Sequence, residues 1–175
     1  MIAGTLMLLL AGASSPRAAQ SDPQATEYQV KAAYLYKFIG YVEWPSRAQA
    51  APDAPLTIGV IGADGLAGEL QQAVAGRTIQ GRAISVRKLG NGDPVAGLQI
   101  LFIGRTASDI AGLLAAARES GVLTVTESDD AFALGSVINF VVVQDKIRFD
   151  IALQSAEHAH LRISSRLLAV ARKVV

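Results

Sequence analysis

The sequence predicts an α/β fold, in which a mainly parallel sheet is flanked by helices and followed by an antiparallel β-hairpin and a terminal helix. Three observations support this prediction. Continuous apolar runs of strand length, typical of strands buried on both faces, recur along the chain. Helical patterns alternate with them, which implies right-handed crossovers between parallel strands. Near the carboxyl end only two residues separate two strand patterns, and so short a connection requires an antiparallel hairpin.

The first structured segment is predicted to be a helix that begins at Glu27. Four large apolar side chains recur near one of its faces: Val30, Tyr34, Phe38 and Tyr41. The helix should end by Glu43-Trp44-Pro45, because proline restricts the backbone of the residue before it. We therefore predict that Trp44 and Pro45 are structural and that the indole closes this helix against the body of the domain.

The central part of the chain alternates between strand and helix patterns. We expect strands at 56–61, 84–89, 99–103 and 122–126, and helices at 66–74 and 108–120. Ser108 is placed to cap the second of these helices, and Gly121 is placed to end it. This order predicts a mainly parallel sheet that is covered by helices.

The last part of the chain changes pattern. Strand patterns at 137–143 and 146–151 flank Gln144-Asp145 and predict the hairpin. A helical turn over 156–161 and a terminal helix over 164–174 complete the expected elements. Since no internal repeat interrupts this order, we predict a single domain over residues 27–175.

The amino terminus has the features of a secretory signal. Ile2–Ala11 is an apolar run, and Ala11-Gly12-Ala13 then supplies small residues at the spacing of a cleavage site. We expect a signal peptide over residues 1–13, with cleavage as late as about residue 20, and a flexible leader over 14–26. The protein is therefore predicted to be exported; the alternative is a buried first helix.

Composition excludes several classes of protein. With 51% hydrophobic and 18% charged residues, the chain has ample material for a packed core and is not predicted to be disordered. A formal net charge of +1 argues against nucleic acid as a partner, which normally requires a basic surface. The absence of cysteine excludes disulfides and thiolate metal sites.

No pattern in the chain is typical of catalysis or of a cofactor. The glycines of residues 62–68 have the spacing G-x-x-G-x-x-G, which differs from the dinucleotide fingerprint and indicates a tight strand-to-helix turn. His158 and His160 would point about 200° apart on a helix, so they are poorly placed to chelate one ion. We predict a protein that is not an enzyme and holds no cofactor or metal.

Two features are candidate recognition surfaces. The first helix concentrates five aromatic side chains in eleven positions: Tyr34, Tyr36, Phe38, Tyr41 and Trp44. Tyr and Trp favour interfaces, although a core helix would also bury some of them. The carboxyl-terminal segment carries Arg148, Arg162 and Arg166, for which a solvated helix face is the alternative interpretation.

These segments resemble a known family, the YfiR family (DUF4154). The opening block is Glu27-Tyr28-Gln29-Val30-Lys31-Ala32-Ala33-Tyr34-Leu35-Tyr36-Lys37-Phe38 with Val42-Glu43-Trp44-Pro45. The later blocks are residues 135–140, 146–151 and 161–168, so the resemblance covers roughly residues 27 to 172. It implies structural roles for Trp44, Pro45, Asn139 and Phe149.

The resemblance also implies a function. It predicts a small, non-catalytic periplasmic regulator that binds the periplasmic sensor region of a membrane-bound diguanylate cyclase and lowers cyclic di-GMP, with effects on biofilm and motility. An outer-membrane lipoprotein would sequester the regulator and relieve the inhibition. Many members carry cysteine pairs, whereas this chain has no cysteine. A homodimer is a further expected assembly.

Two hypotheses follow for the binding surface. In the first, the partner's acidic surface contacts a basic face with Arg148 at its edge, where Arg162 and Arg166 lie side by side if the terminal helix begins early. Tyr34 and Phe38 of the aromatic helix are the other candidates. In the second hypothesis the protein is a periplasmic solute-binding protein. Its ligand would then lie beyond the carboxyl ends of the strands, near 62–65, 104–106 and 127–130.

Overall fold

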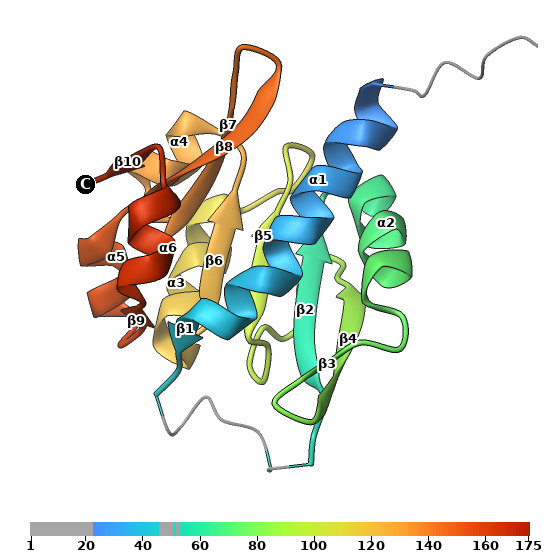
Figure 1. The fold of residues 1–175 in the computed structure, drawn as a ribbon. Helices are drawn as coiled ribbons and strands as arrows, with labels where there is room; N and C mark the ends of the chain where they lie inside the picture. The colour runs from blue at the N-terminus through green and yellow to red at the C-terminus, as the bar shows by residue number, and fades with distance from the viewer. Residues whose placement is uncertain (1–22, 46–50, 52) are drawn as a thin grey trace, which may run out of the picture.

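The computed structural model describes residues 23–45, 51 and 53–175. An eight-stranded sheet forms its centre (Figure 1). From one edge to the other the strands are β10 (Lys173–Val174), β8 (Lys146–Ile151), β7 (Ile138–Val143), β6 (Leu123–Thr126), β5 (Ile100–Ile103), β2 (Leu56–Ile61), β4 (Arg82–Lys88) and β3 (Thr78–Ile79). The pairs between β4 and β7 are parallel, so the predicted mainly parallel sheet is confirmed.

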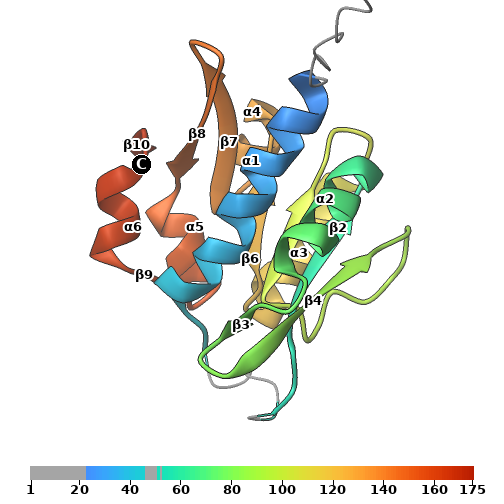
Figure 2. The ribbon, with the colours of Figure 1, turned by 45° about the vertical axis from the view of Figure 1, so that its right-hand side comes forward.

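Helices cover both faces of this sheet (Figures 1 and 2). One face carries α1 (Pro23–Phe38) and α2 (Asp64–Val74), and the opposite face carries α3 (Ile110–Ser120). Two separate cores result, a larger one under α1 and α2 and a smaller one under α3. Four short elements lie around the carboxyl-terminal half: a 3-10 turn η1 (Ile39–Tyr41), α4 (Asp129–Ala133), α5 (Leu153–His158) and α6 (Ser165–Val170).

A second, two-stranded sheet connects the end of α1 to the carboxyl-terminal segment. Its strands are β1 (Val42–Glu43) and β9 (Arg162–Ile163), which pair antiparallel. Glu43 lies opposite Arg162 in this register. The amide of Ser164 extends the pairing by donating to the carbonyl oxygen of Tyr41 at 2.9 Å.

The predicted hairpin is confirmed. β7 and β8 pair antiparallel from Ile138↔Ile151 to Val143↔Lys146. Gln144 and Asp145 make the turn with φ values of 49° and 58°. Two consecutive left-handed residues match the twist of a tight hairpin, which explains how only two residues suffice.

The boundaries of the first helix differ from the prediction. α1 begins at Pro23, so residues 23–26 of the predicted flexible leader are helical. The proposed signal peptide (1–13) and the leader up to residue 22 lie outside the described residues. The buried face of α1 consists of Lys31, Ala32, Leu35 and Phe38, while Val30 is 39% exposed and Tyr41 is 40% exposed. The predicted apolar face is therefore rotated from the one that meets the sheet.

Two further predictions are corrected near the other helices. The cap of α3 is Asp109 rather than Ser108: its carboxylate accepts from the Gly112 amide at 3.1 Å. The terminal helix ends at Val170, where residues 164–174 were expected to be helical. Arg172 then binds the buried Asp150 of β8, and this contact draws the last residues into the sheet as β10.

Candidate functional site

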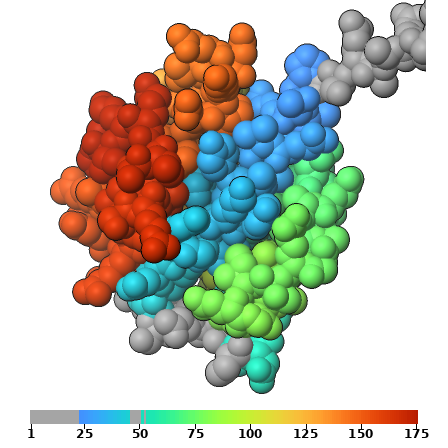
Figure 3. Space-filling model, viewed as in Figure 1, coloured from blue at the N-terminus to red at the C-terminus, as the bar shows by residue number. Residues whose placement is uncertain are grey.

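A groove between α1 and α6 gathers four of the residues predicted from the sequence. Its volume is about 340 Å³, and its lining includes Tyr34, Phe38, Phe149 and Arg166. The remaining lining residues are Lys37, Tyr41, Leu167 and Val170. Figure 3 shows the two chain segments that form the groove, α1 and the carboxyl-terminal part, side by side on one face of the molecule. We call this feature the α1–α6 groove.

Aromatic packing forms the floor of the α1–α6 groove. The Phe38 ring is stacked on Phe140 with centroids 6.0 Å apart and meets the Phe149 ring edge-on at 5.2 Å. Tyr34 also meets Phe149 edge-on, at 5.4 Å. Such offset and edge contacts are the favourable geometries for aromatic pairs, so they stabilise the packing of the floor. Phe38 is 1% exposed, which makes it a core residue rather than a contact surface.

The rim of the groove is cationic and partly apolar. Lys37 and Arg166 are exposed, and the lining residues in the described part of the chain include no Asp or Glu. Tyr41 and Val170 leave apolar surface in water, with exposed fractions of 40% and 61%. An apolar floor beside cations that form no ion pair with any described residue is suited to an acidic, amphipathic partner segment.

The three candidate arginines do not form one face. Arg162 lies in β9 and Arg166 in α6, so the prediction that they stand side by side on one helix is wrong. α6 begins only at Ser165, and Ser164 caps it through a side-chain bond to the Leu167 amide. Arg148 is exposed on β8, where alternation places it on the sheet face opposite to Phe149 and hence away from the α1–α6 groove.

The four residues predicted to be structural are packed against the domain or at its boundary. Trp44 is half-buried, and its indole N–H donates to the backbone oxygen of Gln99 at 3.0 Å. Pro45 follows it and is half-buried. Asn139 is 1% exposed; it accepts from Thr126 Oγ1 at 3.0 Å and donates to Asp129 at 3.3 Å. Phe149 is 2% exposed in the aromatic floor.

The crevice expected at the carboxyl ends of the strands is closed between β2 and β5. A methyl group on Gly104 would lie 2.3 Å from the Gly62 carbonyl oxygen, and one on Gly62 would lie 2.4 Å from the Ala107 nitrogen. Thr106 Oγ1 also donates to the Gly62 oxygen at 2.9 Å. Because these loops are in direct backbone contact, no ligand fits at this point. A hollow of about 370 Å³ remains farther along, beside Glu127, Ser128 and Asp129.

A buried ionic cluster adjoins that hollow and was not predicted from the sequence. Lys31 of α1 bonds Glu27 on its own helix and Glu127 after β6. The Lys31 and Glu127 side chains are 2% and 9% exposed, and the Glu127 carboxylate also accepts from the Arg105 amide at 3.3 Å. The cluster ties α1 to the carboxyl end of the sheet.

A second ion pair stabilises the edge of the sheet, between β8 and β10. Arg172 bonds the buried carboxylate of Asp150 through two nitrogens. This hydrogen bond to Asp150 is the main cause of a raised pKa at Arg172, which therefore stays cationic.

Within residues 23–45, 51 and 53–175, no group of three or more His, Asp or Glu side chains is arranged to hold a metal ion. No helix in the described part of the chain has the length and apolarity to cross a bilayer.

Comparison with known proteins identifies the family of this chain. The family model described as YfiR/HmsC-like (DUF4154) matches residues 28–172. No curated protein sequence matches. A solved structure of a conserved domain protein from Vibrio cholerae O1 biovar El Tor shares the fold, with a TM-score of 0.57 and 12% identity. The match covers 85% of this chain and 60% of that chain, so this chain spans somewhat less than two thirds of that protein's length. A domain from Streptococcus pneumoniae in complex with L-Trp has a TM-score of 0.47 and 10% identity, over 69% of this chain and 55% of that chain.

Proposed function

The chain belongs to the YfiR/HmsC-like family, a family of regulators, and from this premise we propose that it is a non-catalytic periplasmic regulator. Its partner is the periplasmic sensor region of an inner-membrane diguanylate cyclase. Binding favours the inactive state of the cyclase and lowers the output of cyclic di-GMP. An outer-membrane lipoprotein that competes for the regulator would reverse this effect, because sequestration reduces the free regulator.

The α1–α6 groove is the observation that supports a docking role. Its aromatic floor is preformed, and Lys37 and Arg166 stand on its rim without a carboxylate among the lining residues. A partner helix or strand with apolar anchors and an acidic flank complements both properties. Because a stable interface buries about 800 Å² on each partner, the groove would form the centre of a larger contact.

Charge reversal in the groove tests this proposal. A Lys37→Glu/Arg166→Glu variant should bind the purified cyclase sensor domain at least about tenfold more weakly, since two attractive contacts become repulsive. It should also raise cyclic di-GMP in cells toward the level of a gene deletion. Circular dichroism should show a folded protein, because both side chains are exposed.

Arg148→Glu is the control: it reverses one charge on the other sheet face, and it is compared with each single groove variant, Lys37→Glu and Arg166→Glu, as well as with the double variant. We expect it to bind like the unchanged protein. If Arg148→Glu disrupts binding and the groove variant does not, the docking surface lies on the opposite face. If deletion of the gene leaves cyclic di-GMP unchanged, the cyclase is not the partner.

Export requires a separate test. Mass spectrometry of a periplasmic extract should detect a chain that lacks residues 1–13 or slightly more. Full-length protein confined to the cytoplasm would contradict the periplasmic assignment.

A further inference from the structure

The outer edge of the sheet is open along most of β4, at the side of the molecule (Figure 2). β3 pairs only with the first two residues of β4, and no other described strand lies on that side. The Leu89 amide donates to the Val60 oxygen of β2 at 2.8 Å. Because the main-chain groups of a strand point alternately to its two sides, this bond directs the N–H and C=O groups of Val86 and Lys88 away from β2. An unpaired edge of this kind can pair with another strand.

A hollow between α2 and β4 lies beside this open edge. Its volume is about 310 Å³. Val74 and Ala75 line it from the end of α2, and Ile84 and Val86 line it from β4. Side chains that face each other on neighbouring strands share one face of the sheet. A side chain opposite Val86 on an added strand would therefore point into this apolar hollow.

The segment that contains the edge is basic. Residues 75–92 include four basic side chains and no Asp or Glu: Arg77, Arg82, Arg87 and Lys88. Arg87 and Lys88 are exposed and form no ion pair with any described residue. Arg77 is exposed at the hollow, where its Nε donates to the Ala73 oxygen at 2.7 Å.

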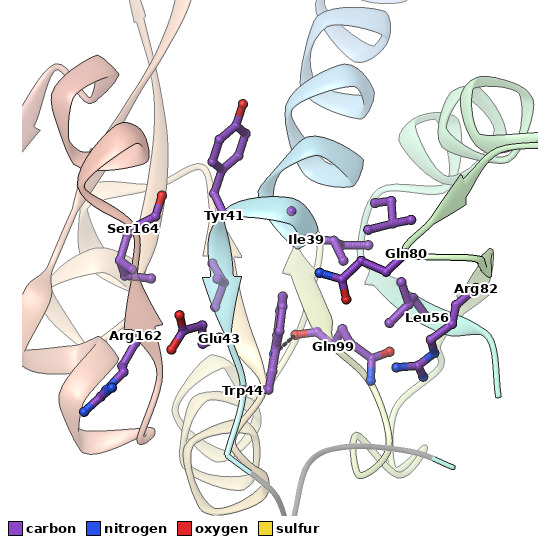
Figure 4. Close-up of a pocket in the computed structure, with 14 residues that line it drawn as sticks. Ile39, Tyr41, Glu43, Trp44, Leu56, Gln80, Arg82, Gln99, Arg162 and Ser164 are labelled. Atoms are coloured by element: carbon purple, nitrogen blue, oxygen red, sulfur yellow. Dashed lines mark hydrogen bonds between the residues drawn. The ribbon is translucent and has the colours of Figure 1, made fainter. Parts of the chain in front are cut away.

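Arg82 is engaged away from the open edge. Its Nε donates to the Ala54 carbonyl oxygen at 2.7 Å. Figure 4 shows Arg82 with Leu56 at the amino ends of the strands, among the residues around a separate cavity. The cations next to the unpaired main-chain groups are therefore Arg87 and Lys88.

A second copy of this chain is a poor occupant of the edge. Two β4 strands paired with each other would bring the same basic side chains together, and like charges on facing strands are destabilising. Basic residues on edge strands oppose such self-pairing. A segment with acidic side chains has the opposite effect, because its carboxylates would face Arg87 and Lys88.

We propose that the open edge of β4 binds an extended acidic segment of a partner protein, which adds one strand to the sheet. The segment runs antiparallel to β4, as β3 does. Its main chain bonds to Val86 and Lys88, its central apolar side chain enters the hollow beside α2, and its acidic side chains face Arg87 and Lys88. The site is separate from the α1–α6 groove and does not depend on a cyclase as the partner.

The probe is the acetylated and amidated peptide Glu-Glu-Val-Thr-Val. Paired antiparallel with β4, it places its two glutamates opposite Lys88 and Arg87 and its central valine opposite Val86. Titration into the isotope-labelled purified chain, followed by NMR, should give saturable shifts of the Val86 and Lys88 amide signals. Both amides should also exchange their hydrogens more slowly in the complex, because each gains an acceptor.

Two further peptides separate strand addition from attraction between charges. The same peptide with an N-methylated central valine keeps every side chain but loses the N–H that pairs with the edge, so it should bind at least about tenfold more weakly. Lys-Lys-Val-Thr-Val keeps the main chain and reverses the charge, and it should also bind at least about tenfold more weakly.

One pair of variants connects binding to the basic side chains. Arg87→Glu/Lys88→Glu should weaken binding of the acidic peptide about tenfold or more and improve binding of the lysine peptide. Lys146→Glu/Arg148→Glu reverses two exposed charges on β8 and is the matched control, which should bind like the unchanged chain. Circular dichroism checks that both variants fold. The peptide comparison uses the unchanged chain, so it decides the question even if a variant fails to fold.

Several outcomes would overturn the proposal. The absence of saturable shifts would mean that the basic side chains only keep the edge from pairing. Equal binding of the N-methylated peptide would exclude strand addition, and equal binding of the lysine peptide would exclude recognition of acidic side chains. Shifts of the same amides with protein concentration alone, together with a dimer in sedimentation, would assign the edge to a second copy. Unchanged affinity in a folded Arg87→Glu/Lys88→Glu variant would remove both side chains from the site.

Discussion

Replacement of Lys31 by methionine tests whether the buried ionic cluster holds α1 on the sheet. Methionine keeps much of the length of the lysine side chain and its apolar stem but removes the ammonium group. Glu127, with a side chain that is 9% exposed, would then lose its main counter-ion while still buried. Glu27 is 33% exposed and would be rehydrated.

The expected loss of stability follows from that burial. Removing one partner of a buried ion pair costs about 3–5 kcal/mol. Since Glu127 keeps the Arg105 amide as a donor, we expect the lower value, about 3 kcal/mol. For a domain of this size, 1 kcal/mol shifts the melting temperature by about 2–4 °C, so the melting temperature should fall by about 6–12 °C.

Urea unfolding followed by circular dichroism measures this loss, and two further variants interpret it. Lys37→Met changes an exposed lysine of the same helix and should alter the free energy of unfolding by less than about 0.5 kcal/mol. Lys31→Met/Glu127→Gln removes both buried charges and should regain more than half of the lost stability. A loss below about 1 kcal/mol in Lys31→Met, or no recovery in the double variant, would refute the reasoning.

Three more predictions test the packing. Trp44→Ala should lower the free energy of unfolding by about 3 kcal/mol, because the indole is packed and hydrogen-bonded; an unchanged value in urea unfolding would contradict its structural role. Gly104→Ala should cost about 2–3 kcal/mol by backbone overlap, whereas Gly68→Ala, inside α2 and in open space, should add up to about 1 kcal/mol. Arg172→Ala should leave Asp150 without its cation and weaken the pairing of β10 with β8. In the unchanged protein the Val175 amide donates to the Ile151 oxygen, so this amide should exchange its hydrogen faster in the variant. Unchanged exchange would show that the ion pair does not hold that strand.

Local sequence patterns predicted the centre of the fold well. The runs at 56–61 and 146–151 are strands with those bounds, because each strand buries a continuous or alternating apolar set that only one register satisfies. Gln144-Asp145 also determined its hairpin, since two residues leave no other connection.

The end of the chain could not be predicted in the same way. Leu167, Val170, Ala171 and Val174 have helical spacing, yet the helix ends at Val170. The deciding contact is between Arg172 and Asp150, which belong to different elements. Tertiary contacts of this kind override local propensity, and a single sequence does not reveal them.

The candidate site was predicted in part. The structure brings Tyr34, Phe38, Phe149 and Arg166 to one groove, although Phe38 is in its floor. Arg162 was placed on a helix because it is four residues from Arg166, whereas it pairs with Glu43 in a strand. The burial of Lys31 could not be predicted from the sequence, because its buried partner Glu127 is 96 residues away.

The aromatic floor of the α1–α6 groove has a consequence for the folding process. It joins Tyr34 and Phe38, near the start of the described chain, to Phe140 and Phe149, near its end. Contacts between distant parts of a chain form late and slow the folding rate, because a long loop must close first. A nascent chain that ends before β8 cannot complete this layer, and its first helix stays uncovered. The polypeptide is therefore expected to fold only after synthesis of its last elements, and a nascent chain that ends before β8 should remain sensitive to protease.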